Sequence, residues 1–195
     1  ALNSAPYYGD ISIKTLLIGT STCPPLEGYK IMIRGIESSL LCRDIPKITY
    51  ATLKEVPSIK EIFVTSRGPF YFTGVGYGYE IGELPVRIEP LMGKETLNQS
   101  SMYYEGYRRF IRNLVASGKK IYLIIDVPEL QETIGNCFPP RPFSYSKRQS
   151  DCIQDVKLVE ERYKVYKSLF KKIKEEFPEI ILFDASSVFC NLNHC

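Results

Sequence analysis

The stretch Lys14-Thr-Leu-Leu-Ile-Gly-Thr-Ser-Thr-Cys-Pro-Pro-Leu-Glu-Gly-Tyr29 decides the fold of this chain. Its short apolar run, from Thr15 to Ile18, predicts a buried strand. Small polar residues at 19–22 then interrupt the run, as they do where a strand ends. Ligands bind beyond the carboxyl ends of strands in open α/β sheets, so the stretch indicates a strand that ends at a pocket.

Strand-like and helix-like segments alternate along the rest of the chain. Short apolar runs predict strands at residues 11–18, 61–65, 121–125 and 180–183. Helical periodicity, with proline or glycine at the boundaries, predicts helices at residues 46–56, 100–117 and 155–177. Residues 23–43 and 66–96 are interpreted as loop-rich. This alternation predicts an α/β fold, a three-layer α/β/α sandwich around a parallel sheet.

The two longest predicted helices each carry an apolar stripe. In residues 100–117 the stripe residues are spaced by four, three and four, which places them on one face; they are Tyr103, Tyr107, Phe110 and Leu114. In residues 155–177 the stripe is Val159, Tyr163, Tyr166, Phe170, Ile173 and Phe177. The strand at 121–125 is almost wholly apolar, which predicts burial on both faces.

Length and composition describe an ordinary globular domain. The chain has 195 residues, of which 44% are hydrophobic and 24% charged, so we expect a single domain with its own core. A net charge of +3 is too small to indicate nucleic acid as a partner. No apolar run approaches the roughly 20 residues that a membrane-spanning helix needs.

The cysteines indicate an oxidising compartment. The six cysteines lie in close pairs around loops, without a Cys-x-x-Cys spacing, and the chain has a single histidine, which disfavours zinc binding. Exported proteins place disulfides in this way, whereas cytosolic proteins rarely do. Sequence proximity predicts the pairs Cys23–Cys42, Cys137–Cys152 and Cys190–Cys195, although the cysteine count alone allows other pairings.

Candidate pocket residues follow the predicted strand at 61–65. Ser66 and Arg67 stand where substrate-contacting residues gather in α/β sheets. Aromatic residues and glycines are concentrated just beyond them, in residues 70–79, and Tyr71 belongs to this group. Two interpretations stay open: an aromatic loop that lines a sugar or acyl pocket, or a loop whose rings pack on the core. For Arg67 the alternative to a substrate contact is a salt bridge at the strand end.

Four motifs in order resemble one known family. They are GTSTCPPLEGY at 19–29, SRGPFYFTG at 66–74, GKKIYLIIDVP at 118–128 and VFCNLNHC at 188–195. Together they are similar to the SGNH-type hydrolase domain fused to membrane acyltransferase-3 proteins, which include O-antigen and exopolysaccharide O-acetylases. The resemblance covers nearly the whole chain.

The resemblance implies a flavodoxin-like strand order and a serine nucleophile with an Asp–His pair. The family pattern places a Gly-Asp-Ser-His block on its first strand, shortly before residue 1, and an Asp-x-x-His block shortly after residue 195. In the sheet, that first strand would lie between the strands at 11–18 and 61–65. Residues 1–195 contain neither block, so we expect the nucleophile and the base to lie outside the chain. No catalytic residue is therefore assigned within it. A pair of Ser66 and His194 is disfavoured, because His194 is expected in an exposed loop.

The resemblance also implies a pocket wall. Thr20 and Ser21 follow the strand where the wider hydrolase family has its oxyanion-hole glycine. Ser66 and Arg67 follow the strand where that family has its asparagine. Neither consensus residue is present here, which leaves backbone N–H groups or Arg67 as candidate oxyanion donors.

The expected function is O-acyl transfer to hydroxyls of a cell-surface glycan, or hydrolysis of such esters, through a serine acyl-enzyme. The alternative is a non-catalytic module that binds glycan and presents it to a membrane transferase. Either way, the implied partners are a membrane-embedded acyltransferase domain in the same polypeptide and a glycan acceptor, at the periplasmic or extracytoplasmic face. No cofactor or metal is expected.

Overall fold

The computed structural model describes residues 2–3, 14–19, 23–78, 85–93, 96–132 and 153–195. Among the predicted features, Thr20, Ser21 and the Cys137–Cys152 pair lie outside these ranges.

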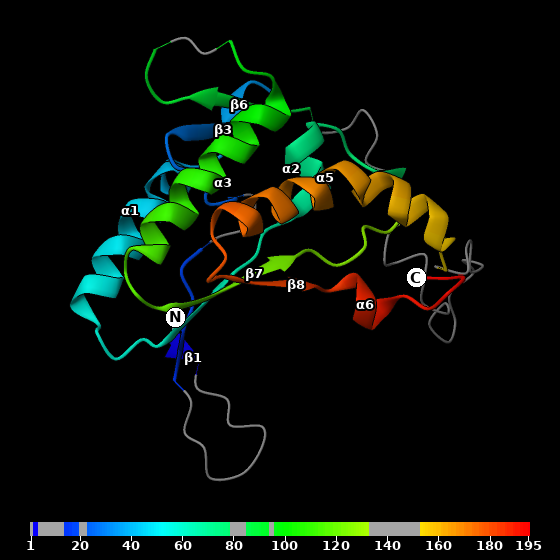
Figure 1. Ribbon diagram of the computed structural model, residues 1–195. Coiled ribbons are helices and arrows are strands. Elements are labelled where there is room, and N and C mark those ends of the chain that lie inside the picture. The colour runs from blue at the N-terminus through cyan, green and yellow to red at the C-terminus, as the bar shows by residue number, and fades with distance from the viewer. Residues whose placement is uncertain (1, 4–13, 20–22, 79–84, 94–95, 133–152) are drawn as a thin grey trace, which may run out of the picture.

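A parallel sheet forms the centre of the molecule (Figure 1). Its strands are β5 (Glu61–Val64), β7 (Lys120–Ile125) and β8 (Ile181–Asp184), in the order β5-β7-β8. Both pairings are parallel, with Ile62 opposite Ile121 and Leu123 opposite Leu182. The predicted parallel sheet is therefore confirmed for the strands at 61–65, 121–125 and 180–183.

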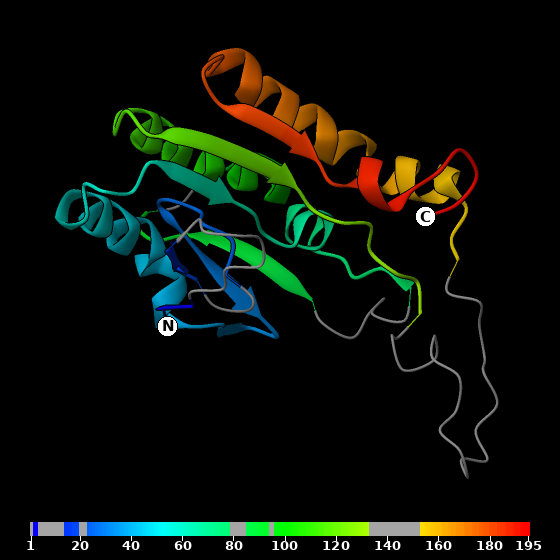
Figure 2. The same ribbon diagram turned by 90° about the horizontal axis from the view of Figure 1, so that it is seen from below.

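Two long helices cover one face of this sheet (Figure 2). They are α3 (Gln99–Val115), capped by Asn98, and α5 (Val156–Glu176), capped by Asp155. Both predicted stripes are buried, because each helix turns its apolar face toward Ile121, Leu123 and Ile125 of β7. The core between these helices and the sheet is rich in tyrosine. The fully buried tyrosines described in this part of the core are Tyr103, Tyr107, Tyr163 and Tyr166.

The opposite face of the parallel sheet is only half covered. The Phe63 side chain is 61% exposed and that of Phe183 is 44% exposed. Phe63 stacks on Tyr122 of the neighbouring strand, with ring centroids 4.5 Å apart. The prediction that residues 121–125 are buried on both faces is therefore wrong for Tyr122 and Ile124, which are partly exposed. One helical layer of the predicted sandwich is present, and the second is not among the described elements.

A second, antiparallel sheet packs beside α1 (Leu40–Glu55), α2 (Gly68–Thr73) and α3. It consists of β4 (Ile36–Glu37), β3 (Tyr29–Ile33) and β6 (Val86–Pro90), in that order. The interpretation of residues 23–43 as loop is corrected here, since Tyr29 and Ile31 alternate with outward-facing residues. Arg34 and Gly35, both with positive φ, make the tight hairpin turn between β3 and β4.

Helix α1 (Leu40–Glu55) begins six residues before the predicted start at Pro46. The Ser39 side chain accepts a hydrogen bond from the Leu41 N–H and so caps the helix. Pro46 lies inside the helix, where it is buried. A short helix, α2 (Gly68–Thr73), and strand β6 likewise replace part of the loop expected at 66–96.

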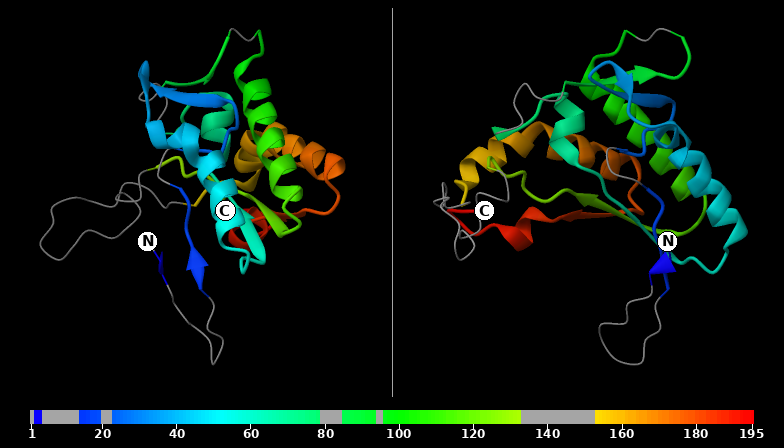
Figure 3. Two further views of the ribbon diagram at one scale, coloured as in Figure 1. Left: turned by 90° about the vertical axis from the view of Figure 1, so that its left-hand side faces the viewer. Right: turned by 180° about the vertical axis from the view of Figure 1, so that it is seen from behind.

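The described part of the predicted first strand, residues 14–18, does not join the parallel sheet. Strand β2 (Thr15–Leu16) pairs antiparallel with β1 (Leu2–Asn3) instead, and its residues are exposed (Figure 3). Residues 11–13 lie outside the described ranges. In the expected strand order, one further strand lies between this strand and β5, and that strand is not among the described ones. Without it, the backbone groups of the first strand would have no partner in the parallel sheet, which is a physical reason for its pairing with β1.

Two of the three predicted disulfides are confirmed. Cys23 is bonded to Cys42, which ties the segment before β3 to α1. Cys190 is bonded to Cys195, which closes a small loop after α6 (Ser186–Phe189). Among the described residues, every cysteine is in a disulfide. The Cys137–Cys152 pair stays a prediction.

Candidate functional site

The carboxyl end of β5 carries Ser66 with its hydroxyl turned into the core. The Ser66 hydroxyl forms a short hydrogen bond with the Tyr107 hydroxyl and lies 3.3 Å from that of Tyr103. Burial holds the pKa of Tyr103 and of Tyr107 well above the ordinary value, so both phenols stay neutral. Ser66 thus belongs to a buried hydroxyl network, and its oxygen is engaged by tyrosines rather than by a base.

Asp126 lies at the corresponding end of β7. Its carboxylate accepts hydrogen bonds from the Gly68 N–H at 3.2 Å and from the Val127 N–H at 2.9 Å. A side chain at Gly68 would collide with the ring of Tyr166, so the backbone reaches Asp126 only because residue 68 is glycine. The Gly68 N–H is therefore committed to Asp126, which removes it from the candidate oxyanion donors.

Glu129 follows three residues later and connects two arginines. Its side chain is 4% exposed, and its carboxylate oxygens lie 3.3 Å from the Arg67 Nε and 3.0 Å from the Arg162 Nε. Arg67 also stacks on the Phe70 ring, with its guanidinium carbon 4.4 Å from the ring centroid. More than a third of the Arg67 side chain stays exposed (38%). The strand-end salt bridge that sequence reasoning held as the alternative for Arg67 is present.

Burial shifts the proton affinity of both carboxyl groups at this edge. Desolvation raises the pKa of Glu129, and the nearby Arg162 and Arg67 guanidinium groups offset part of that rise. Desolvation also raises the pKa of Asp126, against the hydrogen bonds from Gly68 and Val127 and the charge of Arg67. Two carboxyl groups with raised pKa therefore lie beside a partly exposed arginine at this edge of the sheet.

The aromatic segment beyond Arg67 is part of the core. The side chains of Phe70, Tyr71 and Phe72 are 2%, 3% and 6% exposed. A ring buried to this degree is not accessible for stacking on a sugar. Of the two interpretations for residues 70–79, the burial of these three rings favours packing on the core, and the pocket role of Tyr71 stays a prediction.

The carboxyl end of β8 holds a second polar cluster. The Asp184 carboxylate accepts hydrogen bonds from the Ser186 hydroxyl at 2.6 Å and from the Lys167 ammonium at 2.7 Å, and Lys167 also donates to Ser186. Burial alone would raise the pKa of Asp184, but the bonds from Lys167 and Ser186 outweigh it and lower the pKa. In this cluster Lys167 donates to the Ser186 hydroxyl, and Ser186 donates to Asp184, so Lys167 is not arranged as the base that would activate Ser186.

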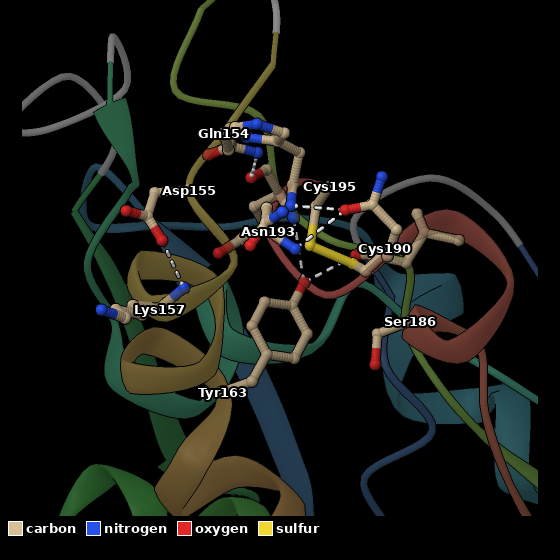
Figure 4. Close-up of a disulfide and its surroundings, with 12 residues drawn as sticks. Gln154, Asp155, Lys157, Tyr163, Ser186, Cys190, Asn193 and Cys195 are labelled. Atoms are coloured by element: carbon tan, nitrogen blue, oxygen red, sulfur yellow. Dashed lines mark hydrogen bonds between the residues drawn. A yellow bond between two sulfur atoms is a disulfide. The ribbon is translucent and has the colours of Figure 1, made fainter.

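The disulfide loop after α6 docks on the segment before α5 (Figure 4). Gln154 and Cys195 exchange two backbone hydrogen bonds, of 3.1 and 3.0 Å. His194 is exposed, as expected, and its backbone N–H donates to Asn191. The hydrogen bonds of Ser66 go to the two tyrosines, and none among the described residues joins it to His194.

Sequence reasoning placed Ser66 and Arg67 at this edge, and it missed Asp126, Glu129 and Arg162. Asp126 carries the same signal as Ser66, a polar residue directly after a buried strand. Arg162 gives no such signal, because it lies within a long charged helix. A surface hollow of about 380 Å³ lies elsewhere, between α1 and α3 beside Lys119 at the amino end of β7.

Within the described ranges no group of histidine, cysteine or acidic residues is arranged to hold a metal ion. In the same ranges no helix has the length and apolar character needed to cross a bilayer.

Comparison with known proteins yields one match. The family model described as SGNH domain (fused to AT3 domains) matches residues 8–195. No curated protein and no solved structure matches the chain.

Proposed function

The chain belongs to the family of SGNH domains fused to AT3 domains, and from that premise we propose that it is the extracytoplasmic domain of an O-acyltransferase. In this proposal it transfers acetyl or similar acyl groups to hydroxyls of a cell-surface glycan, or hydrolyses such esters. Membership supports an acyltransferase- or esterase-associated module in general terms. The glycan acceptor and the acyl-enzyme route are the proposed part.

The observation that carries the proposal is the partly exposed Arg67 at the carboxyl end of β5, the strand at the edge of the parallel sheet. Among the described strands, β5 has a neighbour on one side only, namely β7. A strand added on the other side would end next to Ser66 and Arg67. We propose that a flanking segment supplies this strand with the serine nucleophile, and that flanking helices complete the three-layer sandwich over Phe63 and Phe183.

The proposed chemistry follows serine acyl transfer. The serine oxygen attacks the acyl carbonyl of the donor while a histidine takes its proton, and the donor alcohol leaves with a proton returned by the histidine. A glycan hydroxyl, or water, then attacks the acyl-enzyme by the same steps in reverse. In this proposal the guanidinium fork of Arg67 stabilises the oxyanion in both steps.

Two observations support the proposed compartment and partner. Two disulfides are typical of a protein that leaves the cytoplasm. The family is defined by its fusion to AT3 domains, which supports a membrane acyltransferase domain in the same polypeptide. We call that whole polypeptide the intact fusion protein.

Turnover of p-nitrophenyl acetate tests this proposal. The intact fusion protein is expected to hydrolyse the ester, whereas residues 1–195 alone are expected to show no turnover above background. Ser66 is hydrogen-bonded to tyrosines and Ser186 to Asp184 and Lys167, and no described histidine pairs with either serine. Turnover by residues 1–195 that Ser66→Ala abolishes would show that the chain carries its own nucleophile. An intact fusion protein without turnover or acetyl transfer would favour the glycan-presenting module.

A further inference from the structure

Glu129 is a buried carboxylate that pairs with two arginines, an arrangement that the stability of the fold does not require. Its side chain is 4% exposed and meets Arg67 on one side and Arg162 on the other. Taking a carboxylate and its cationic partners out of water costs free energy, and apolar side chains of similar volume often stabilise a protein equally well. Stability alone therefore gives no reason for a carboxylate at this position.

The two arginines at Glu129 are held differently. Arg162 is 13% exposed and is fixed on all sides: its Nε binds Glu129, its Nη2 donates to the Val75 carbonyl at 2.8 Å, and its Nη1 lies 3.4 Å from the Thr73 hydroxyl. Arg67 is 38% exposed and lies at the carboxyl end of β5. Arg162 thus neutralises and anchors the carboxylate, and Arg67 is the arginine presented at the edge of the sheet.

The backbone of Glu129 is fixed as firmly as its side chain. Its N–H donates to the Tyr163 hydroxyl at 3.1 Å, and that hydroxyl donates to the Val127 carbonyl at 2.6 Å. Its carbonyl accepts a hydrogen bond of 2.7 Å from the Gln154 side chain. The Gln154 backbone in turn forms hydrogen bonds with the backbone of Cys195 in the disulfide loop. The position of Glu129 is therefore set by β7, α5 and that loop together.

We propose that Glu129 is a positioning residue that holds the Arg67 guanidinium in the orientation in which it binds an anionic oxygen at the strand ends. This inference rests on the proposed function, in which that oxygen develops on the acyl group. The carboxylate accepts from the Arg67 Nε, while the Phe70 ring supports the guanidinium plane. Together they restrict a long side chain to one arrangement before substrate binds, which is the preorganisation that oxyanion stabilisation needs.

The test is Glu129→Gln in the intact fusion protein, with kcat and KM for p-nitrophenyl acetate, the melting temperature and the rate at which phenylglyoxal modifies Arg67. We expect kcat to fall about 10-fold with little change in KM, because a misoriented donor weakens a contact made mainly in the transition state. The modification of Arg67 should become faster as its carboxylate partner is lost. Glu129→Asp, which keeps the charge but shortens the reach, should show the same pattern if Glu129→Gln does not fold.

The matched control is Glu176→Gln. Glu176 also bridges two arginines, Arg108 and Arg112, but on the outer surface of α3 and α5. This variant should leave kcat and the modification of Arg67 unchanged.

Three outcomes would overturn the inference. The first is a folded Glu129→Gln variant with unchanged kcat. The second is a loss of kcat that accompanies a lowered melting temperature, with no change in the rate of Arg67 modification. The third is an equal rate of Arg67 modification in the wild-type protein and the variant. A wild-type fusion protein without turnover would instead overturn the proposed function. In that case, the rate of Arg67 modification would by itself show whether Glu129 holds Arg67.

Discussion

The Arg67 side chain forms a salt bridge and is also partly exposed at the protein surface. Its Nε binds a buried carboxylate and its guanidinium stacks on Phe70, yet 38% of the side chain is exposed at the sheet edge. Sequence reasoning treated the salt bridge and the substrate contact as alternatives. The geometry allows both, because the bridge to Glu129 leaves part of the Arg67 side chain exposed.

Arg67→Lys separates charge from geometry. In the intact fusion protein we expect activity to fall by at least about 10-fold, since an ammonium keeps the charge but loses the planar fork of donors. Folding should persist if the role is chemical. Melting temperature and turnover, measured together, check this: unchanged values of both would refute the proposed role, and a large loss of both would assign Arg67 to the strand-end salt bridge alone.

At the scale of elements, long periodic segments were predicted well and short ones were not. Helices α3 and α5 match their predicted stripes because many residues repeat one pattern. Strand β3 escaped prediction, since its alternation of Tyr29 and Ile31 with outward residues spans only five positions between glycines. The start of α1 was misplaced because Pro46 resembles a first-turn proline, whereas the cap that begins the helix is Ser39.

The Ser39 cap gives a test of where α1 begins. Ser39→Ala removes the acceptor for the Leu41 N–H and should lower the free energy of unfolding by about 1 kcal/mol. Ser168→Ala, at an exposed interior position of α5, should cause no comparable loss, because alanine favours helix. Thermal unfolding of both variants measures the difference. Equal melting temperatures would place the start of the helix nearer to Pro46.

At the scale of the whole molecule, the site is assembled from distant segments. Arg67 and Ser66 could be predicted because they directly follow a strand. Glu129 and Arg162 could not be predicted in this way. Nothing in the sequence shows that the loop after β7, which carries Glu129, and helix α5, which carries Arg162, both approach Arg67. The exposed Phe63 and Phe183 and the single neighbour of β5 agree with a sheet that continues beyond the described strands.

The central claim is that this chain provides the pocket wall of a serine acyltransferase whose nucleophile lies in a flanking segment. Labelling the intact fusion protein with a fluorophosphonate, followed by peptide mapping, tests it most directly. We predict one labelled serine, located outside residues 1–195. A label on Ser66, Ser186 or another serine within residues 1–195, or no labelled serine at all, would contradict the account.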